Sequence, residues 1–198
     1  MISKFQDGKV INRKCIQSID VCSIDDNGAG EKVKMVTVED PVINFDRFKT
    51  LFCNQELGIT EEALKSVDCY LELDNGQIYL IEFKNGKIDN SVRKDLNTKL
   101  KDSLLMINHS FEQNLGYAKT NINYVVVYNS TKNGLSAKSF KSAMNKKTSK
   151  SKSIRFDLSK MSDILNSVNT IAQEDFNQFW QDKISKRLLN PTNNSYCA

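Results

Sequence analysis

Residues 67–84 read VDCYLELDNGQIYLIEFK, and this stretch decides how the chain arranges its most informative side chains. Apolar and polar residues alternate before the Asn75-Gly76 pair, which predicts a strand followed by a tight turn. The residues after the turn are almost wholly apolar, as expected of a strand that is covered on both faces. The sequence therefore predicts a hairpin whose second strand lies inside a sheet.

The length of the turn sets which residues face each other across this hairpin. A two-residue loop would place Asp68 opposite Phe83, whereas a three-residue loop with Gly76 in the left-handed region places Asp68 opposite Glu82. A slip of one residue moves every side chain to the other face, and only the second register keeps carboxylates out of the apolar face. We therefore predict the three-residue loop. Its apolar face comprises Cys69, Leu71, Leu73, Tyr79, Ile81 and Phe83, and its other face Asp68, Tyr70, Glu72, Ile78, Leu80, Glu82 and Lys84.

This register brings Asp68, Glu82 and Lys84 together, a set that suits metal-assisted hydrolysis of a phosphodiester. Magnesium and manganese prefer oxygen ligands from one or two carboxylates and keep several waters for the substrate. We expect Asp68 and Glu82 to hold Mg²⁺ or Mn²⁺, with the carbonyl of Phe83 as a further ligand. Lys84 would orient the attacking water and offset charge on the phosphoryl oxygens. The alternative is a surface salt-bridge trio on an exposed hairpin.

Helical and strand patterns flank the hairpin. Phenylalanine and leucine recur at helical spacing over residues 45–57, and Gly58 ends that pattern. A long helix is expected to begin near Asp89 or Asn90, and residues 124–128 form a short β-branched run typical of a buried strand. The long helix carries one apolar stripe, formed by Val92, Leu96, Leu100, Leu104, Ile107 and Phe111.

With these elements, the hairpin residues resemble the PD-(D/E)xK nuclease superfamily, which includes restriction endonucleases and Holliday-junction resolvases. The resemblance rests on Asp68 and on Glu82-Phe83-Lys84 at the end of an apolar strand, and it covers about residues 45–130. It implies an α/β fold with a mixed sheet and an αβββαβ restriction-endonuclease-like core. It also implies metal-dependent cleavage of nucleic acid, with catalytic roles for Asp68, Glu82 and Lys84. Val67 stands where the name-giving proline is common, and no short strand is evident between the first helix and Val67.

Many members of the superfamily also carry an acid on the first helix. Glu56, Glu61 and Glu62 compete for that role in this chain, and Glu62 is the favoured candidate.

The rest of the chain is expected to elaborate one domain, 1–198. Residues 10–24 and 32–38 alternate apolar and polar side chains around a turn at Asp25-Asp26-Asn27-Gly28, which predicts that residues 1–44 form an N-terminal hairpin elaboration. Residues 131–198 are expected to form a basic loop with a short helix at 136–144, a strand at 154–157 and C-terminal helices, the last of which runs from Ile171 to Leu188.

The net charge of +4 hides an uneven distribution. Residues 1–112 carry 15 bases and 19 acids, whereas residues 113–198 carry 13 bases and 5 acids. Such a separation is typical of an acidic site beside a surface that binds a polyanion. A solvated loop in a lysine-rich protein is the alternative. The lysines expected to contact a nucleic-acid backbone are Lys132, Lys138, Lys141, Lys146 and Lys147.

Five irregularly spaced cysteines and an N-terminus with no apolar run indicate reduced thiols, a cytoplasmic location and no membrane span. The predicted function is a metal-dependent nuclease whose partner is DNA or RNA, and the sequence also permits a homodimer. The first alternative is a catalytically inactive module of the same fold that binds nucleic acid or protein through its basic C-terminal half. The second is a pure interaction protein whose long helices bind a partner.

Overall fold

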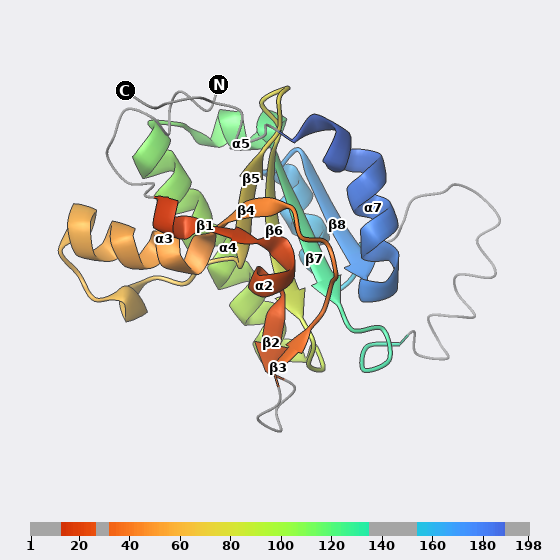
Figure 1. Ribbon diagram of the computed structural model, residues 1–198. Coiled ribbons are helices and arrows are strands. Elements are labelled where there is room, and N and C mark those ends of the chain that lie inside the picture. Colours follow the sequence, from red (N-terminus) through yellow and green to blue (C-terminus); the bar gives the residue numbers. More distant parts are fainter. Residues whose placement is uncertain (1–12, 27–31, 135–153, 189–198) are drawn as a thin grey trace.

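The computed structural model describes residues 13–26, 32–134 and 154–188, and at its centre lies a six-stranded mixed sheet (Figure 1). The order of strands across the sheet is β1-β4-β5-β6-β7-β8. Neighbours from β1 to β6 pair antiparallel, whereas β7 is parallel to both β6 and β8. These strands are β1 (Ile16–Ser18), β4 (Pro41–Asn44), β5 (Cys69–Glu72), β6 (Ile78–Lys84), β7 (Ile122–Tyr128) and β8 (Ser167–Ala172), and β2 (Ile24–Asp26) pairs separately with β3 (Lys32–Lys34).

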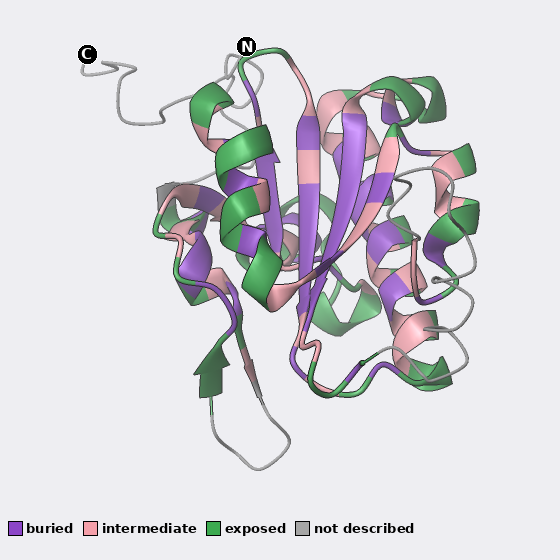
Figure 2. Cartoon of the chain, turned by 90° about the vertical axis from the view of Figure 1, so that its right-hand side faces the viewer, coloured by how far each residue is buried: buried purple, intermediate pink, exposed green. Residues whose placement is uncertain are grey.

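Helices cover both faces of the sheet, so that the central strands are buried along their length (Figures 1 and 2). The helix α4 lies on one face with α3, and α7 lies on the other. The α- and π-helical segments are α2 (Ile19–Cys22), α3 (Phe45–Leu51), a π-helical continuation of α3 (Phe52–Leu57), α4 (Asn90–Phe111), α5 (Leu115–Asn121) and α7 (Phe176–Lys183). Short 3₁₀ turns occupy Arg13–Cys15, Glu61–Ala63, Leu158–Asp163, Gln173–Asp175 and Ser185–Arg187.

The first predicted helix is confirmed, and local sequence explains both of its ends. The side chain of Asn44 accepts a hydrogen bond from the backbone N–H of Arg47 at 3.0 Å, which caps the start of α3. The helical backbone continues to Leu57 and ends at Gly58, whose φ of 63° is the left-handed conformation that glycine adopts without strain.

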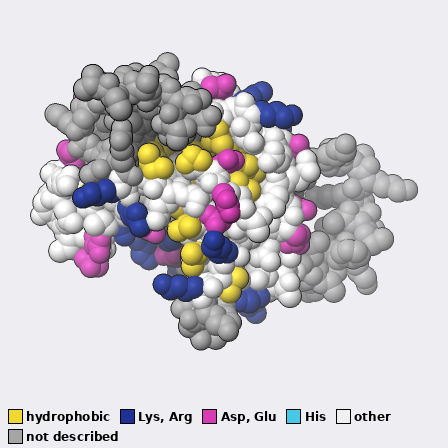
Figure 3. Space-filling view, viewed as in Figure 1, with side chains coloured by type: hydrophobic (Ala, Val, Ile, Leu, Met, Phe, Trp, Pro, Cys, Tyr) yellow, Lys and Arg dark blue, Asp and Glu magenta, His cyan; other side chains and the backbone are white. Residues whose placement is uncertain are grey.

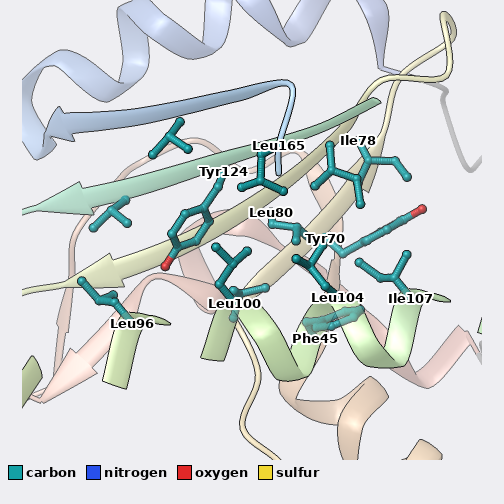
Figure 4. Packing of buried hydrophobic residues seen from close by; sticks show 14 of the residues in the cluster. Phe45, Tyr70, Ile78, Leu80, Leu96, Leu100, Leu104, Ile107, Tyr124 and Leu165 are labelled. Atoms are coloured by element: carbon teal, nitrogen blue, oxygen red, sulfur yellow. The ribbon is translucent and has the colours of Figure 1, made fainter. Parts of the chain in front are cut away.

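The long second helix is also confirmed. Its N-cap is Asp89, whose carboxylate accepts the N–H groups of Ser91 and Val92 at 2.9 and 3.0 Å. The predicted apolar stripe turns toward the sheet, and the helix ends at Glu112 in a left-handed conformation. Figure 4 shows the resulting contact of Leu96, Leu100, Leu104 and Ile107 with Ile78, Leu80 and Tyr124 of the sheet.

The hairpin has the predicted register. Tyr70 lies opposite Leu80. The same register places Leu73 opposite Gln77 at the turn and Asp68 opposite Glu82 at the other end of the hairpin. The N–H of Leu73 donates to the carbonyl of Gln77 at 2.8 Å, and Gly76 has a φ of 77°. The turn is therefore the three-residue loop with a left-handed glycine.

Around the hairpin, the order of elements differs from the expected αβββαβ. The strand next to β5 is β4, and β4 precedes α3 instead of following it. Ile43 pairs with Tyr70, and the N–H of Phe45 donates to the carbonyl of Asp68 at 2.9 Å. Residues 41–128 therefore read βαββααβ, and only the turn Glu61–Ala63 separates the first helix from β5.

The C-terminal part corrects two predictions. Residues 154–157 are not a strand, because Phe156 and Asp157 have φ values of 63° and 59° and form a turn. The last strand is instead β8, which contains Ile171, the residue we placed in the final helix. Ile171 joins Phe176 in one apolar cluster, but it does so from a strand and not from the final helix.

The N-terminal hairpin is interrupted. Residues 24–26 pair with 32–34 in a separate two-stranded sheet, residues 16–18 pair with 41–43 at the edge of the main sheet, and the helix α2 breaks the alternating pattern between them. The helix expected at 136–144 lies outside the described residues. Within the described ranges, no helix combines the length and the apolar composition that a membrane crossing requires.

Replacing Gly76 tests the turn that sets the hairpin register. Gly76→Ala should lower the free energy of unfolding by about 1 kcal/mol, because an alanine at this positive φ is strained. Gly86→Ala is the matched control, since Gly86 has no positive φ and open space around its Cα. Urea denaturation measures both, and equal losses in the two variants would contradict the prediction.

Candidate active site

The candidate site lies where β5 begins and β6 ends. Asp68 immediately precedes β5, and its backbone N–H donates to the carbonyl of Ile81 at 3.1 Å, which holds it in register with Glu82. Glu82 and Lys84 are two residues apart on β6 and therefore point to the same face. That face is covered by α4, so the acids lie beneath a helix and not on an open hairpin.

The three predicted residues come together, and a fourth joins them. Glu82 Oε1 accepts a hydrogen bond from Lys99 Nζ at 2.7 Å and forms an ion pair with Lys84 Nζ at 2.8 Å. The same Lys99 Nζ lies 3.5 Å from Asp68 Oδ1. The side chain of Glu82 is fully buried, which excludes the alternative of an exposed salt-bridge trio.

Phe83 contributes through its backbone and its ring. Its N–H donates to Asp68 Oδ2 at 2.6 Å, which orients the carboxylate of Asp68 toward the site. Its ring points to the opposite face of the sheet and packs edge-on against Phe176. A role for the Phe83 carbonyl as a metal ligand stays a prediction.

Lys99 is the functional residue that the sequence reasoning missed. It lies on α4 three residues after Leu96 and four before Ser103, both fully buried. A lysine at such a sheet-facing position would have to pair with a buried acid, and this was the available signal in the sequence. Only 18% of its side chain is exposed.

The acids considered on the first helix are placed elsewhere. Glu62 is exposed in a 3₁₀ turn and lines a separate hollow of about 330 Å³ with Glu61, and Glu56 is exposed at the end of the π-helical turn. Asp46 of α3 lines the same hollow, where it accepts a hydrogen bond from Ser66, and its charge adds to the surroundings of Lys99.

Burial and neighbouring charge perturb the ionisation of these groups. Burial, and then the charge of Glu82, raise the pKa of Asp68 to about 8, although Lys99, the Phe83 N–H and Lys84 oppose the shift. Burial would lower the pKa of Lys99, but the charges of Glu82 and Asp68 outweigh burial and raise this pKa above its usual value. The buried carboxylate of Glu82 and the partly buried carboxylate of Asp68 therefore favour an added positive charge between them.

The segment before β5 is fastened to α4. The buried N–H of Val67 donates to Ser103 Oγ at 3.0 Å, and the N–H of Lys65 donates to Asp102 Oδ2 at 2.9 Å. The ammonium of Lys65 pairs with Asp95 one turn before Lys99, and Asp95 Oδ2 lies 4.0 Å from Lys84 Nζ. Burial by itself would raise the pKa of Asp95. The charges of Lys65, Lys84 and Lys99 outweigh burial, so this pKa lies below its usual value.

A cleft of about 520 Å³ opens beside Lys84. One wall is the first turns of α4, and another includes Asp25 of β2, whose carboxylate accepts the N–H of Asn85 at 2.8 Å. Lysine and arginine side chains gather around the β2–β3 hairpin in Figure 3. The lysines that line the cleft are Lys65, Lys84, Lys87 and Lys94.

Four of the five lysines predicted to contact a nucleic-acid backbone lie outside the described residues. Lys132 is exposed in the turn after β7 and does not line the cleft. Lys138, Lys141, Lys146 and Lys147 lie outside the described residues.

Comparisons with known proteins find no relative. No protein-family model, no curated protein and no solved structure matches the chain. In the part of the chain that the structure describes, no cluster of three or more His, Cys, Asp and Glu side chains could hold a metal ion. The acidic component of the site is therefore the pair Asp68 and Glu82.

Removing the hydroxyl of Ser103 tests the anchor that positions this pair. Ser103→Ala should destabilise the protein by about 1–3 kcal/mol, because it leaves the buried N–H of Val67 without a partner. Ser110→Ala on the same helix is the control, since that hydroxyl is buried and none of the described residues hydrogen-bonds to it. Chemical denaturation reports both, and a loss at Ser110 as large as at Ser103 would show that the hydrogen bond is not the cause.

Proposed function

We propose that this protein is a metal-dependent nuclease that hydrolyses phosphodiester bonds of nucleic acid. Asp68 and Glu82 hold Mg²⁺ or Mn²⁺, and Lys84 assists the attacking water. One observation carries the proposal: a single ammonium nitrogen, Lys99 Nζ, lies within 3.5 Å of an oxygen of each carboxylate. The two acids are therefore close enough to share one cation, beside a cleft that opens at Lys84.

The residues present fit such an ion. Two carboxylates are a common protein contribution to a magnesium site, in which waters and substrate oxygens fill the other positions. Glu82 Oε2 is buried and accepts no hydrogen bond from any described residue, so it can accept one from a water that the ion holds. The Phe83 carbonyl at the same end of β6 is the third expected ligand.

Each residue has a distinct chemical task. A bound divalent ion would lower the pKa of a coordinated water and polarise the phosphoryl group. The N–H of Phe83 fixes the orientation of Asp68. Lys84 lines the cleft while its ammonium contacts Glu82, a position from which it can donate to the attacking water or to a phosphoryl oxygen.

The resemblance to the PD-(D/E)xK superfamily supports the same proposal. The acid, the second acid and the lysine lie on paired strands with a helix packed over them, as the resemblance implies. The order βαββααβ and Val67 in place of proline are the departures.

The cleft is the proposed path of the nucleic-acid backbone. The side chains of Lys87 and Lys94 are exposed at its edge and form no ion pair within the described part of the chain. Two such ammonium groups beside Lys84 suit phosphates on either side of the one that is cleaved. This assigns backbone binding to residues other than those predicted from the basic segment.

Substitution of the site residues tests hydrolysis directly. Asp68→Asn, Glu82→Gln and Lys84→Met should each reduce cleavage of a labelled oligonucleotide in Mg²⁺ or Mn²⁺ by about 100-fold or more. Single-stranded and duplex DNA and RNA serve as substrates, and cleavage is followed by gel electrophoresis.

Two controls accompany this assay. Asp74→Asn alters an exposed carboxylate in the turn of the same hairpin, and Lys183→Met removes an exposed charge from α7 on the other face of the sheet. Both variants should cleave as the unaltered protein does. Cleavage that survives Asp68→Asn and Lys84→Met would refute the assigned roles.

The cleft lysines are tested by the dependence of binding on salt. Lys87→Met and Lys94→Met should each reduce the slope of log K against log salt by roughly 0.7–0.9, because each removes one phosphate contact. Fluorescence anisotropy in EDTA measures binding without cleavage, with Lys183→Met as the control. A slope that neither cleft variant changes would place the backbone elsewhere.

A second candidate is a module of the same fold that binds nucleic acid and does not cut it. The observation that favours it is the pairing of Lys84 and Lys99 with Glu82, which already neutralises the buried charge without a metal. This candidate predicts binding that survives Glu82→Gln and no cleavage in any divalent ion. The oligonucleotide assays above separate the two functions.

A further inference from the structure

We propose that Lys99 is an internal counter-cation of the site: its ammonium holds the place between Asp68 and Glu82, and a divalent ion must displace it to bind. The proposal rests on the proposed function only in assuming that these two carboxylates are the metal ligands. It concerns the regulation of the same site by a residue that the motif does not contain.

The contacts of Lys99 carry the argument. Its Nζ is 2.7 Å from Glu82 Oε1 and 3.5 Å from Asp68 Oδ1, so that one positive charge faces both acids. Magnesium binds its oxygen ligands at about 2.0–2.1 Å, in the same region between the carboxylates. An ammonium and a divalent ion cannot occupy that region together, because their charges repel at such a separation.

Lys84 does not share this position. Its Nζ contacts Glu82 and lies 4.0 Å from Asp95, and it lines the cleft. Lys84 can therefore keep its place when a cation binds, whereas Lys99 cannot. The two lysines have separate tasks, although both contact the same oxygen of Glu82.

The displaced ammonium has other acceptors within the fold. Asp95 lies four residues before Lys99 on α4, and Asp46 of α3 already adds its charge to the surroundings of Lys99. A lysine has a long side chain with rotatable bonds, which allows its head to move while the helix stays in place. The movement needs no change in the backbone.

The consequence is a site that folds without metal and binds it weakly. The buried carboxylates of the metal-free protein are neutralised by lysine, whereas the metal-bound form must give up the hydrogen bond from Lys99 to Glu82. Metal affinity is then set by this competition as well as by the ligands. Removing the ammonium should strengthen metal binding even though it removes no ligand.

Metal binding by Lys99→Met tests the competition. Isothermal titration of the full chain with Mn²⁺ should give a dissociation constant at least about tenfold lower than that of the unaltered protein, because a charge-assisted hydrogen bond no longer has to be broken. Lys101→Met is the matched control on the same helix, since Lys101 is exposed. It should bind Mn²⁺ as the unaltered protein does.

Thermal unfolding provides a second readout. In EDTA, Lys99→Met should melt below the unaltered protein, and saturating Mn²⁺ should raise its melting temperature by the larger amount. If Lys99→Met is unfolded in EDTA, Mn²⁺ should restore its circular dichroism. Failure of Mn²⁺ to do so in both Lys99→Met and Lys99→Gln would overturn the proposal. So would folded variants that bind Mn²⁺ no more tightly than the unaltered protein.

These results are distinguishable from a failure of the proposed nuclease function. If Lys99→Met binds Mn²⁺ but the unaltered protein neither binds it nor cuts nucleic acid, the counter-cation assignment stands and the nuclease proposal fails. If the unaltered protein cuts nucleic acid and both proteins bind Mn²⁺ equally, the nuclease proposal stands and the assignment of Lys99 fails.

Discussion

The carboxylate of Glu82 is fully buried between a sheet and a helix, and the arrangement around it follows from that single constraint. A buried charge without a partner would destabilise the fold by several kcal/mol, so ammonium groups must reach it. Lys84 lies on the same strand as Glu82, and Lys99 lies on α4, which packs over this strand. The helix that covers the apolar sheet face thereby also completes the polar cluster.

Further contacts hold the segments around this cluster in place. Ser103 and Asp102 of α4 accept N–H groups from the segment before β5, which keeps Asp68 beside the helix. Asp25 ties the β2–β3 hairpin to the end of β6. Asn133 accepts the buried N–H of Ile88, which holds the loop between β6 and α4. Three separate parts of the chain therefore converge at the end of the sheet where β5 begins and β6 ends.

The register of the hairpin could be predicted because the order of charged and apolar residues along the two strands allows only one pairing that keeps carboxylates off the apolar face. Asp68, Glu82 and Lys84 were found together for the same reason. The strand at 167–172 was missed, since its buried residues, Val168 and Ile171, lie three positions apart and do not alternate. The place of β4 was missed because pairing between β4 and β5 spans the whole of α3, a distance over which no local pattern acts.

The sequence by itself determined the two long helices, the hairpin with its turn and the opposition of Asp68 to Glu82, because these depend on spacing and on the conformation of a few residues such as Gly76. Only the tertiary structure decided that the charged face is buried and that Lys99 lies between the acids. The angle at which α4 crosses the sheet selects which of its polar side chains meets Glu82. That angle depends on packing between distant segments, which no local sequence pattern records.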